Sequence, residues 1–373
     1  MARRDKKQRT WFGKMMVFIL TILAVIGLIA MALSVVNAYV NPQNFIWTTV
    51  FGLAFWVIFF FNVAVFLLLL MFWSNKIWIT VAALIIAIPG IAKSFSFGTP
   101  KKAENSIRVM SYNVHLFDHI DGTTKREDFA NQVMEMVREQ APDILCCQEF
   151  GGFNSKLTRQ KCSEVFAENV GFQYIYYNRK NNYSGNVIFS KYPLAKVAED
   201  SGFGQENTYG VMVSVDAGEK GRFHIANVHL LSYMITNDEI DVLVNSSEHQ
   251  EKLDTIGKSV LHKLKYAFQR RSDELKTVLS DGMPPVEGPI IICGDFNEPP
   301  MSYNYRQMQK AGYVDTFTKV GFGIKPTFAG KLPLLRIDYI WANDGVRPLA
   351  FERYKYQASD HYPIILDFAI NQN

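Results

Sequence analysis

Residues 290–297 read Ile-Ile-Ile-Cys-Gly-Asp-Phe-Asn, and this stretch decides the fold. An apolar run of this length, closed by a glycine, is typical of a buried strand. Asp295 and Asn297 follow the strand directly, so we expect them at the rim of a sheet, where an active site can form. The same arrangement recurs on both sides of this stretch, over about 270 residues.

The strands that we expect alternate with helical patterns, which is typical of a large α/β domain. The expected strands are Ile107 to Asn113, Ile144 to Gln148, Tyr174 to Tyr177, Gly185 to Phe189, Val211 to Val215, Phe223 to Leu230, Ile290 to Cys293, Ile337 to Trp341 and Tyr362 to Phe368. Apolar residues at helical spacing predict helices over Asp128 to Gln140 and around Gly257 to Ser280. All four cysteines fit buried strands or helices, without the spacing of a zinc site.

Polar motifs stand at or near the ends of six apolar runs. They are Ser-Tyr-Asn-Val at 111–114, Gln-Glu at 148–149, Asn-Val-His-Leu at 227–230, Gly-Asp-Phe-Asn at 294–297, Arg-Ile-Asp-Tyr-Ile at 336–340 and Ser-Asp-His at 359–361. Each motif alone has an ordinary explanation, such as an Asx turn at residues 295–297 or a hydrogen-bonded core histidine at residue 229. Six of them in this order indicate an active site.

The six motifs resemble those of the endonuclease/exonuclease/phosphatase superfamily, which includes deoxyribonuclease I, abasic-site endonucleases and inositol polyphosphate 5-phosphatases. The resemblance covers residues 105–373. It implies an α/β (α+β) four-layer sandwich, in which two packed and mostly antiparallel β-sheets are flanked by helices. It also implies a metal-dependent hydrolase acting on phosphate ester bonds, either as a phosphatase or as a phosphodiesterase.

The resemblance implies a role for each polar residue. Hydrolysis of a phosphate ester needs a divalent cation, and hard oxygen ligands suit Mg²⁺, for which Mn²⁺ could substitute. Glu149 would be the main metal ligand, beside Asn113 and Asp360. Asp295 and Asn297 lie two residues apart, so in an extended segment both would face the attacking water or a second ion.

The resemblance also assigns the catalytic histidines. His361 would act as general base or stabilise the charged phosphoryl group, with Asp338 orienting its imidazole. His229 would donate to a phosphoryl oxygen, and Asn227 on the same strand face would steady it. One position departs from the abasic-site endonucleases, which carry an acidic residue two positions after the first Asn, where this chain has His115. The stretch from Ser232 to Lys258 is long for the family and has no readable motif.

The first 98 residues form a different region, because no Asp, Glu, Lys or Arg occurs from Met15 to Asn75. About 20 apolar residues span a bilayer, so we expect spans at about 15–40 and 45–73. A third span at about 77–97 requires Phe95 and Phe97 to join it. The alternative for this segment is a buried or interfacial helix, and the alternative for the first is a cleaved signal peptide. Residues 99–104 would link this region to the catalytic domain at 105–373.

Basic residues before the first span place the amino terminus in the cytoplasm by the positive-inside rule. These are Arg3, Arg4, Lys6, Lys7, Arg9 and Lys14. With three spans, the protein is a multi-pass membrane protein with an extracytoplasmic catalytic domain. Nothing in the sequence indicates a protein partner.

Charge narrows the substrate class. The chain has a net charge of +4, but residues 1–98 hold eight Lys or Arg and one Asp, so residues 99–373 carry −3. The catalytic region therefore lacks the positive field of a nonspecific nucleic-acid binder. We expect a phosphorylated substrate that is lipid-linked or small and extracytoplasmic, as for membrane-anchored relatives that act on undecaprenyl pyrophosphate. The alternatives are a membrane-tethered nuclease and a catalytically inactive binding domain.

Overall fold

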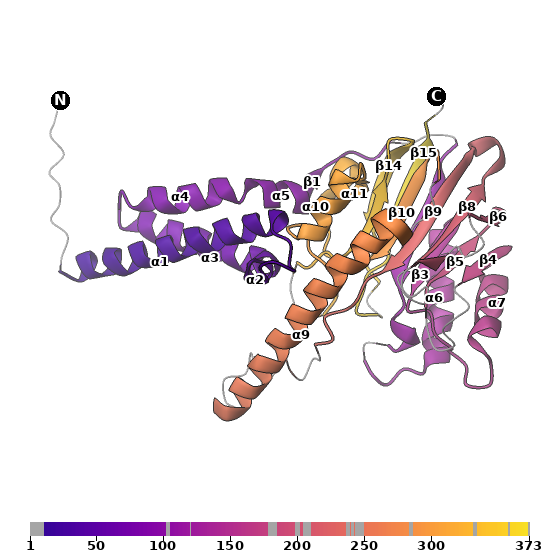
Figure 1. The fold of residues 1–373 in the computed structure, drawn as a ribbon, viewed down its shortest axis with the longest axis horizontal. Helices are drawn as coiled ribbons and strands as arrows, with labels where there is room; N and C mark the ends of the chain where they lie inside the picture. Colours follow the sequence, from indigo (N-terminus) through magenta and orange to yellow (C-terminus); the bar gives the residue numbers. More distant parts are fainter. Residues whose placement is uncertain are drawn as a thin grey trace. The chain divides into compact units, whose positions relative to one another are not determined.

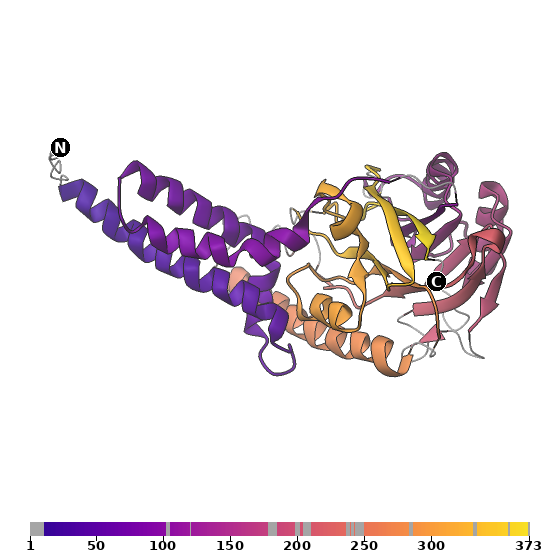
Figure 2. The ribbon, with the colours of Figure 1, turned by 90° about the horizontal axis from the view of Figure 1, so that it is seen from above.

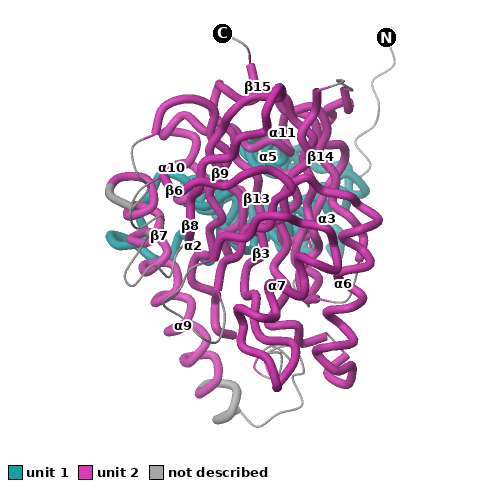
Figure 3. The backbone as a smooth tube through the Cα atoms, turned by 90° about the vertical axis from the view of Figure 1, so that its right-hand side faces the viewer, with its two compact units in different colours: residues 1–93, 301–303 teal, residues 94–300, 304–373 magenta. Residues whose placement is uncertain are grey.

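The computed structural model describes residues 11–101, 105–119, 121–177, 185–197, 202–203, 210–235, 239, 242, 250–282, 286–330, 334–356 and 359–371. The chain divides into two compact units, drawn in two colours in Figure 3. Unit 1 comprises residues 1–93 with 301–303, and unit 2 comprises residues 94–300 with 304–373. Unit 2 therefore contains the region in which the sequence predicts the catalytic domain, except residues 301–303.

Unit 1 is built from apolar helices. They are α1 (Trp11–Val36) with the 3₁₀ turn Asn37–Tyr39, α2 (Trp47–Leu53), α3 (Phe55–Met71), α4 (Ile77–Ile86) and α5 (Ile88–Ser94), whose last residue belongs to unit 2. Among the described residues, one helix, Trp11–Tyr39, is long and apolar enough by itself to cross a membrane. The pair α2 and α3 bends by 69° and the pair α4 and α5 by 45°, so up to three spans are possible if each bent pair is one span.

Unit 2 contains two large sheets. One sheet has the order β14-β15-β2-β3-β5-β4. Its strands are β2 (Ile107–Asn113), β3 (Ile144–Gln148), β4 (Tyr174–Tyr177), β5 (Val187–Ser190), β14 (Val346–Arg353) and β15 (Ile364–Ile370). The other has the order β11-β13-β10-β9-β8-β6, with β7 also paired to β8. Its strands are β6 (Leu194–Lys196), β7 (Gly202–Phe203), β8 (Gly210–Asp216), β9 (Arg222–His229), β10 (Ile290–Asp295), β11 (Val314–Asp315) and β13 (Asp338–Ala342).

Each sheet contains one parallel pair among its antiparallel neighbours, β2 with β3 in one and β9 with β10 in the other. Parallel strands end at the same edge of a sheet, so each pair delivers two strand ends to one rim. The register pairs Asn113 with Gln148 in the first sheet and His229 with Asp295 in the second. This arrangement brings the polar motifs of the sequence together.

Three layers of apolar side chains hold these elements in place, and the helices of unit 2 flank the sheets (Figures 1 and 2). One core lies between the sheets and includes Val109, Ile225 and Phe317. A second joins the β2–β3 sheet to α6 (Arg126–Gln140) and α7 (Arg159–Val170). The third joins the β9–β10 sheet to α9 (Gln250–Thr277) and α10 (Tyr303–Lys310). The expected four-layer sandwich is confirmed, with sheets that are mixed.

Cysteine burial confirms the alternation of strand β3. Cys146 packs in the core between the sheets, whereas Cys147 packs in the core under α6 and α7. Successive strand residues point to opposite faces, which places the two thiols in different layers. All four cysteines are buried and unbridged.

Gly294 in β10 is required by a close backbone approach. Its φ of +140° is unfavourable for other residues, and a Cβ placed there would lie 1.8 Å from the carbonyl oxygen of Val228 in β9. The glycine thus allows the ends of β9 and β10 to approach each other beside His229 and Asp295.

Predicted strand bounds lie within about two residues of the observed ones, but the sequence missed the short strands β6, β7 and β11, the edge strand β14, and a small separate sheet. That sheet pairs β1 (Phe95–Phe97) with β12 (Phe322–Ile324), and β12 follows helix α11 (Thr316–Val320). The third apolar segment therefore ends as a helix at Ser94, not at residue 97. Residues 236–238, 240–241 and 243–249 of the stretch 232–258 lie outside the described residues.

Candidate active site

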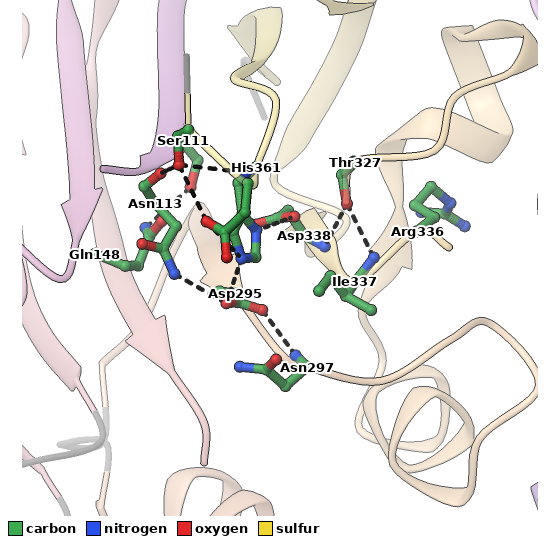
Figure 4. A network of polar contacts seen from close by, with 12 residues as sticks. Ser111, Asn113, Gln148, Asp295, Asn297, Thr327, Arg336, Ile337, Asp338 and His361 are labelled. Carbon is green, nitrogen blue, oxygen red and sulfur yellow. Dashed lines mark hydrogen bonds and ion pairs between the residues drawn. The ribbon is translucent and has the colours of Figure 1, made fainter. Parts of the chain in front are cut away.

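Six segments of unit 2 bring their polar side chains to one rim, as Figure 4 shows for the central residues. Asn113 and His229 end strands β2 and β9, and Asp295 ends β10. Asp338 begins β13 directly opposite Asp295 in the antiparallel register. Glu149 follows β3, and residues 359–361 precede β15.

Asn113 lies between two carboxylates. Its Nδ2 donates to Oε1 of Glu149 and to Oδ2 of Asp295, each at 3.1 Å. Its Oδ1 accepts a hydrogen bond from the backbone N–H of His115. Glu149 has a φ of +49°, an uncommon conformation for a residue other than glycine, and its side chain remains partly exposed. The two carboxylates therefore share one amide, with Glu149 partly exposed and Asp295 buried.

His361 lies between two aspartates and is buried. Its Nδ1 is 3.0 Å from Oδ2 of Asp338, and its Nε2 is 3.6 Å from Oδ2 of Asp295. Burial alone lowers the pKa of His361, but the charges of Asp338 and Asp295 outweigh it, and the pKa is raised well above its usual range. The two flanking carboxylates therefore favour the protonated form of the imidazole. This favours stabilisation of the phosphoryl group over the general-base alternative for His361.

Asp295 is a buried carboxylate whose pKa is raised, chiefly by desolvation, although His361 opposes the shift. Its Oδ1 accepts a hydrogen bond from the backbone N–H of Asn297. Asn297 has a φ of +52°, so the segment is the Asx turn that the sequence offered as the ordinary explanation, and not an extended segment. Because of this turn, the Asn297 and Asp295 side chains need not point to the same side. The Nδ2 atom of Asn297 donates to the carbonyl oxygen of Leu230.

His229 lies beside Asp295 in the same sheet and faces Glu149, which follows β3 of the other sheet. Its Nε2 lies 3.5 Å from Oε1 of Glu149 and 3.8 Å from Oδ2 of Asp295. This nitrogen is buried and has no hydrogen-bond partner. Its neighbours at ion-pair distance are the two carboxylates, and its role toward a substrate stays a prediction.

Asn227 does not steady His229, contrary to the expectation from the sequence. Its Nδ2 donates to the carbonyl oxygens of Cys147 and Val187, and its Oδ1 accepts from Nε2 of Gln148. The buried amide thus connects the two sheets beneath the site. The expectation failed because residues two apart on one strand face need not share a partner when the facing sheet offers backbone carbonyls.

Two supporting residues have contacts that the sequence analysis did not predict. Oγ1 of Thr327 accepts hydrogen bonds from the backbone N–H groups of Ile337 and Asp338, which fixes the start of β13. The hydroxyl of Ser359 donates to the carbonyl oxygen of Asn113 and thereby joins the His361 segment to β2. Ser359 stands in the Ser-Asp-His motif, but its partner is distant in the chain, and no local pattern marks Thr327.

Asp360 lies at the margin of this cluster and not at its centre. Its Oδ1 is 4.0 Å from Nε2 of His361 and 3.9 Å from Nδ1 of His115, and its side chain is partly exposed. His115 thus occupies the position of the missing acidic residue and faces Asp360. The predicted metal role of Asp360 stays a prediction.

The oxygen donors fit a hard divalent cation. Glu149 and Asp295 supply carboxylates and Asn113 an amide, the ligand types that Mg²⁺ and Mn²⁺ accept. Asp295, Asp338 and His361 also lie close enough to hold an ion as a group. A metal-bound imidazole must be neutral, however, and the raised pKa of His361 opposes that state. Glu149 is the partly exposed carboxylate of this group, and the predicted metal roles of Glu149 and Asn113 stay predictions.

Sequence comparison agrees with this geometry. Residues 110–361 match the endonuclease/exonuclease/phosphatase family, and residues 14–94 match a domain of unknown function, DUF8431. The chain therefore belongs to the endonuclease/exonuclease/phosphatase family. Its members are usually hydrolases that act on phosphodiester bonds, typically with divalent metal ions. No curated protein matches the chain.

Solved structures share the fold. An endonuclease/exonuclease/phosphatase from Beutenbergia cavernae is 18% identical, with 71% of this chain and 72% of that chain covered and a TM-score of 0.50. An AP endonuclease from Archaeoglobus fulgidus is 17% identical over 70% and 98% of the two chains, with a TM-score of 0.46. The human Nocturnin catalytic domain is 19% identical over 73% and 96%, with a TM-score of 0.45. At these identities the likeness concerns the fold and leaves the substrate open.

Proposed function

We propose that this protein is a membrane-anchored phosphohydrolase that uses Mg²⁺ or Mn²⁺ and removes a phosphate or pyrophosphate from a lipid-linked or small extracytoplasmic substrate. The observation that carries the catalytic part is His361, held between Asp338 and Asp295 at 3.0 and 3.6 Å. The Nδ2 atom of Asn113 donates hydrogen bonds to both Asp295 and Glu149. Asp295 thus lies next to both the His361 imidazole and the residues that would hold a divalent cation.

The residues divide the chemistry as follows. A divalent cation, held by Glu149 and Asn113, would neutralise charge on the phosphoryl oxygens. Asp295, whose pKa is raised by burial, accepts the proton of the attacking water. Protonated His361 donates a hydrogen bond to the phosphoryl group, and Asp338 holds the imidazole in place.

Three further residues complete the site in this proposal. His229 reaches a phosphoryl oxygen with its unpartnered Nε2. Asn297 fixes the turn after β10 through Leu230 and so sets the position of Asp295. Asp360, at the margin, would complete the environment of the cation.

Unit 1 supports the membrane part of the proposal. Helices α1, α3 and α4 run side by side in Figures 1 and 2, with α3 antiparallel to its neighbours. Exposed tryptophans, Trp11, Trp73 and Trp78, lie at one end of these helices, and exposed Tyr39 and Trp47 lie at the other. Aromatic residues at both ends are typical of helices that cross a bilayer. With the basic amino terminus inside, three spans would put unit 2 outside the cytoplasm.

Tethering favours a substrate in the membrane. Helix α5 ends at Ser94 and strand β1 begins at Phe95, so unit 2 starts without a linker after the third apolar segment. Attachment of this kind raises the local concentration of a lipid-linked substrate but not of a soluble one. The net charge of −3 on residues 99–373 also offers no general attraction for DNA.

A phosphate-release assay tests the proposal with detergent-solubilised full-length protein. Lipid pyrophosphate, a soluble phosphoester and nucleotides are compared with Mg²⁺, with Mn²⁺ and with EDTA, and DNA nicking is measured in parallel. We expect metal-dependent turnover, highest on the lipid substrate. Nicking of duplex DNA without lipid turnover would instead identify a membrane-tethered nuclease, and turnover in EDTA would contradict the mechanism.

A further inference from the structure

The small sheet of β1 and β12 carries four apolar side chains on one face. Its antiparallel register places Phe97 opposite Phe322 and Phe95 opposite Ile324. Directly opposed residues lie on the same side of a sheet, as do residues two apart on one strand. We call the surface formed by Phe95, Phe97, Phe322 and Ile324 the aromatic face.

The aromatic face is open. Phe97 is 80% exposed and Phe322 is 63% exposed, which makes them the most exposed large apolar side chains among the described residues of unit 2. The rings of Phe95 and Phe97 contact each other with centroids 4.7 Å apart. Phe97 and Phe322 are strongly exposed and lie opposite each other in the sheet. Exposure of two such phenyl rings to water is unfavourable, so this face is suited to contact with a membrane or another surface.

The opposite face is attached to unit 2. Ser96 is buried, and its hydroxyl donates to the carbonyl oxygen of Thr318 in α11. Gly98 then passes so close to α11 that a Cβ would lie 2.6 Å from Cα of Val320. Because these contacts occupy one side of the sheet, the aromatic face must point away from α11.

Chain connectivity identifies the occupant. Unit 1 ends at Lys93, and Phe97 follows four residues later. At no more than about 3.6 Å per residue, Phe97 lies within about 14 Å of the end of the apolar segment, however the two units are arranged. Phe322 is its direct partner across the sheet. Both rings therefore lie close to the bilayer if that segment spans or enters it.

Basic side chains border the same region. Lys93 precedes β1, exposed Lys319 lies on α11, and Lys325 follows β12. Lysines beside exposed aromatic rings suit a membrane interface with anionic headgroups, where the rings insert and the ammonium groups meet phosphate. A protein partner would not require this flanking charge.

We propose that the aromatic face binds the lipid bilayer interface and fixes the orientation of unit 2 on the membrane. This inference rests on the membrane anchoring proposed above. It assigns the small sheet a role separate from catalysis, because none of its residues lies among the polar residues of the candidate site.

Spin labelling tests the contact in the full-length protein, reconstituted in nanodiscs of phosphatidylethanolamine and phosphatidylglycerol. The native cysteines are buried, so Phe322→Cys introduces an accessible thiol. Background labelling of the native cysteines is measured with the wild type. Glu164→Cys on the exposed side of α7 is the matched control. We expect the label at residue 322 to gain oxygen accessibility and lose nickel-chelate accessibility relative to residue 164. Equal, water-like values at both positions would overturn the inference.

A second experiment separates this inference from the anchoring and from the catalytic proposal. The double variant Phe97→Ala/Phe322→Ala should lose roughly tenfold in kcat/KM on vesicle-embedded lipid phosphate, the scale of two partly buried phenyl rings. Its turnover of a soluble phosphoester should be unchanged, as should both activities of the control Tyr266→Ala. Membrane retention after alkaline washing tests anchoring alone. If the protein stays in the membrane but the label at residue 322 is exposed to water, only the present inference is contradicted. The same holds if a second copy of the protein buries the label in detergent.

Discussion

Replacing Asp338 by Asn should shift the pH dependence of catalysis. Oδ2 of Asp338 lies 3.0 Å from Nδ1 of His361, and its charge helps to raise the pKa of that imidazole. A carboxylate at this distance changes a pKa by about 1–3 units, or about 1.4–4 kcal/mol. Asn keeps a hydrogen-bond acceptor but removes the charge, so the pKa of His361 should fall by that amount.

The sign follows from the role of the imidazolium. If protonated His361 stabilises the phosphoryl group, activity falls as pH rises through its pKa, and the alkaline limb of the Asp338→Asn profile moves to lower pH. The same protonation stabilises the folded protein. That contribution is complete below the ordinary histidine pKa of about 6.5 and is lost as pH rises through the raised value. Asp338→Asn should therefore lower Tm most at acidic and neutral pH.

The assay is kcat/KM for a soluble chromogenic phosphoester across the pH range at fixed Mg²⁺. Asp344→Asn is the matched control, since Asp344 is an exposed residue just after the same strand. Its profile should match that of the wild type. A folded Asp338→Asn protein with an unshifted alkaline limb would refute the role given to the imidazolium.

Further changes have separate readouts. His361→Ala or Asp295→Ala should each reduce turnover at least about a hundredfold in steady-state assays, and a fully active His361→Ala protein would contradict the mechanism. Glu149→Gln should raise the Mg²⁺ concentration needed for half-maximal activity, measured by metal titration, whereas an unchanged requirement would move the metal site elsewhere. Gly294→Ala should lower stability by more than about 3 kcal/mol in denaturant unfolding, because its Cβ would meet a backbone oxygen at 1.8 Å; a small loss would mean that β9 and β10 can separate.

The sequence predicted the positions of polar residues at strand ends, while their roles stay predictions. Asn113, His229 and Asp295 end central strands, and the parallel pairing that aligns these ends follows from a common topology. The sequence analysis failed where the contact of a side chain depends on a partner that is distant in the chain. The Asn297 side chain bonds to Leu230, which follows β9, and Asn227 bonds to carbonyls of the opposite sheet.

The membrane boundary shows the same limit. Apolar composition suggested that Phe95 and Phe97 extend the third helix, but pairing with residues 322–324 makes them a strand. The hydropathy of residues 95–97 contains no information about a strand partner more than two hundred residues away in the chain. The short strand β11 and the edge strand β14 were missed for a related reason, since their pairing partners supply most of the pattern.

The central claim is tested most directly by kcat/KM of the full-length protein on a lipid pyrophosphate and on duplex DNA, at matched Mg²⁺ and salt. We predict a higher value on the lipid substrate, abolished by EDTA, restored by Mg²⁺ and lost in His361→Ala. Efficient DNA nicking without release of phosphate from the lipid would contradict the account.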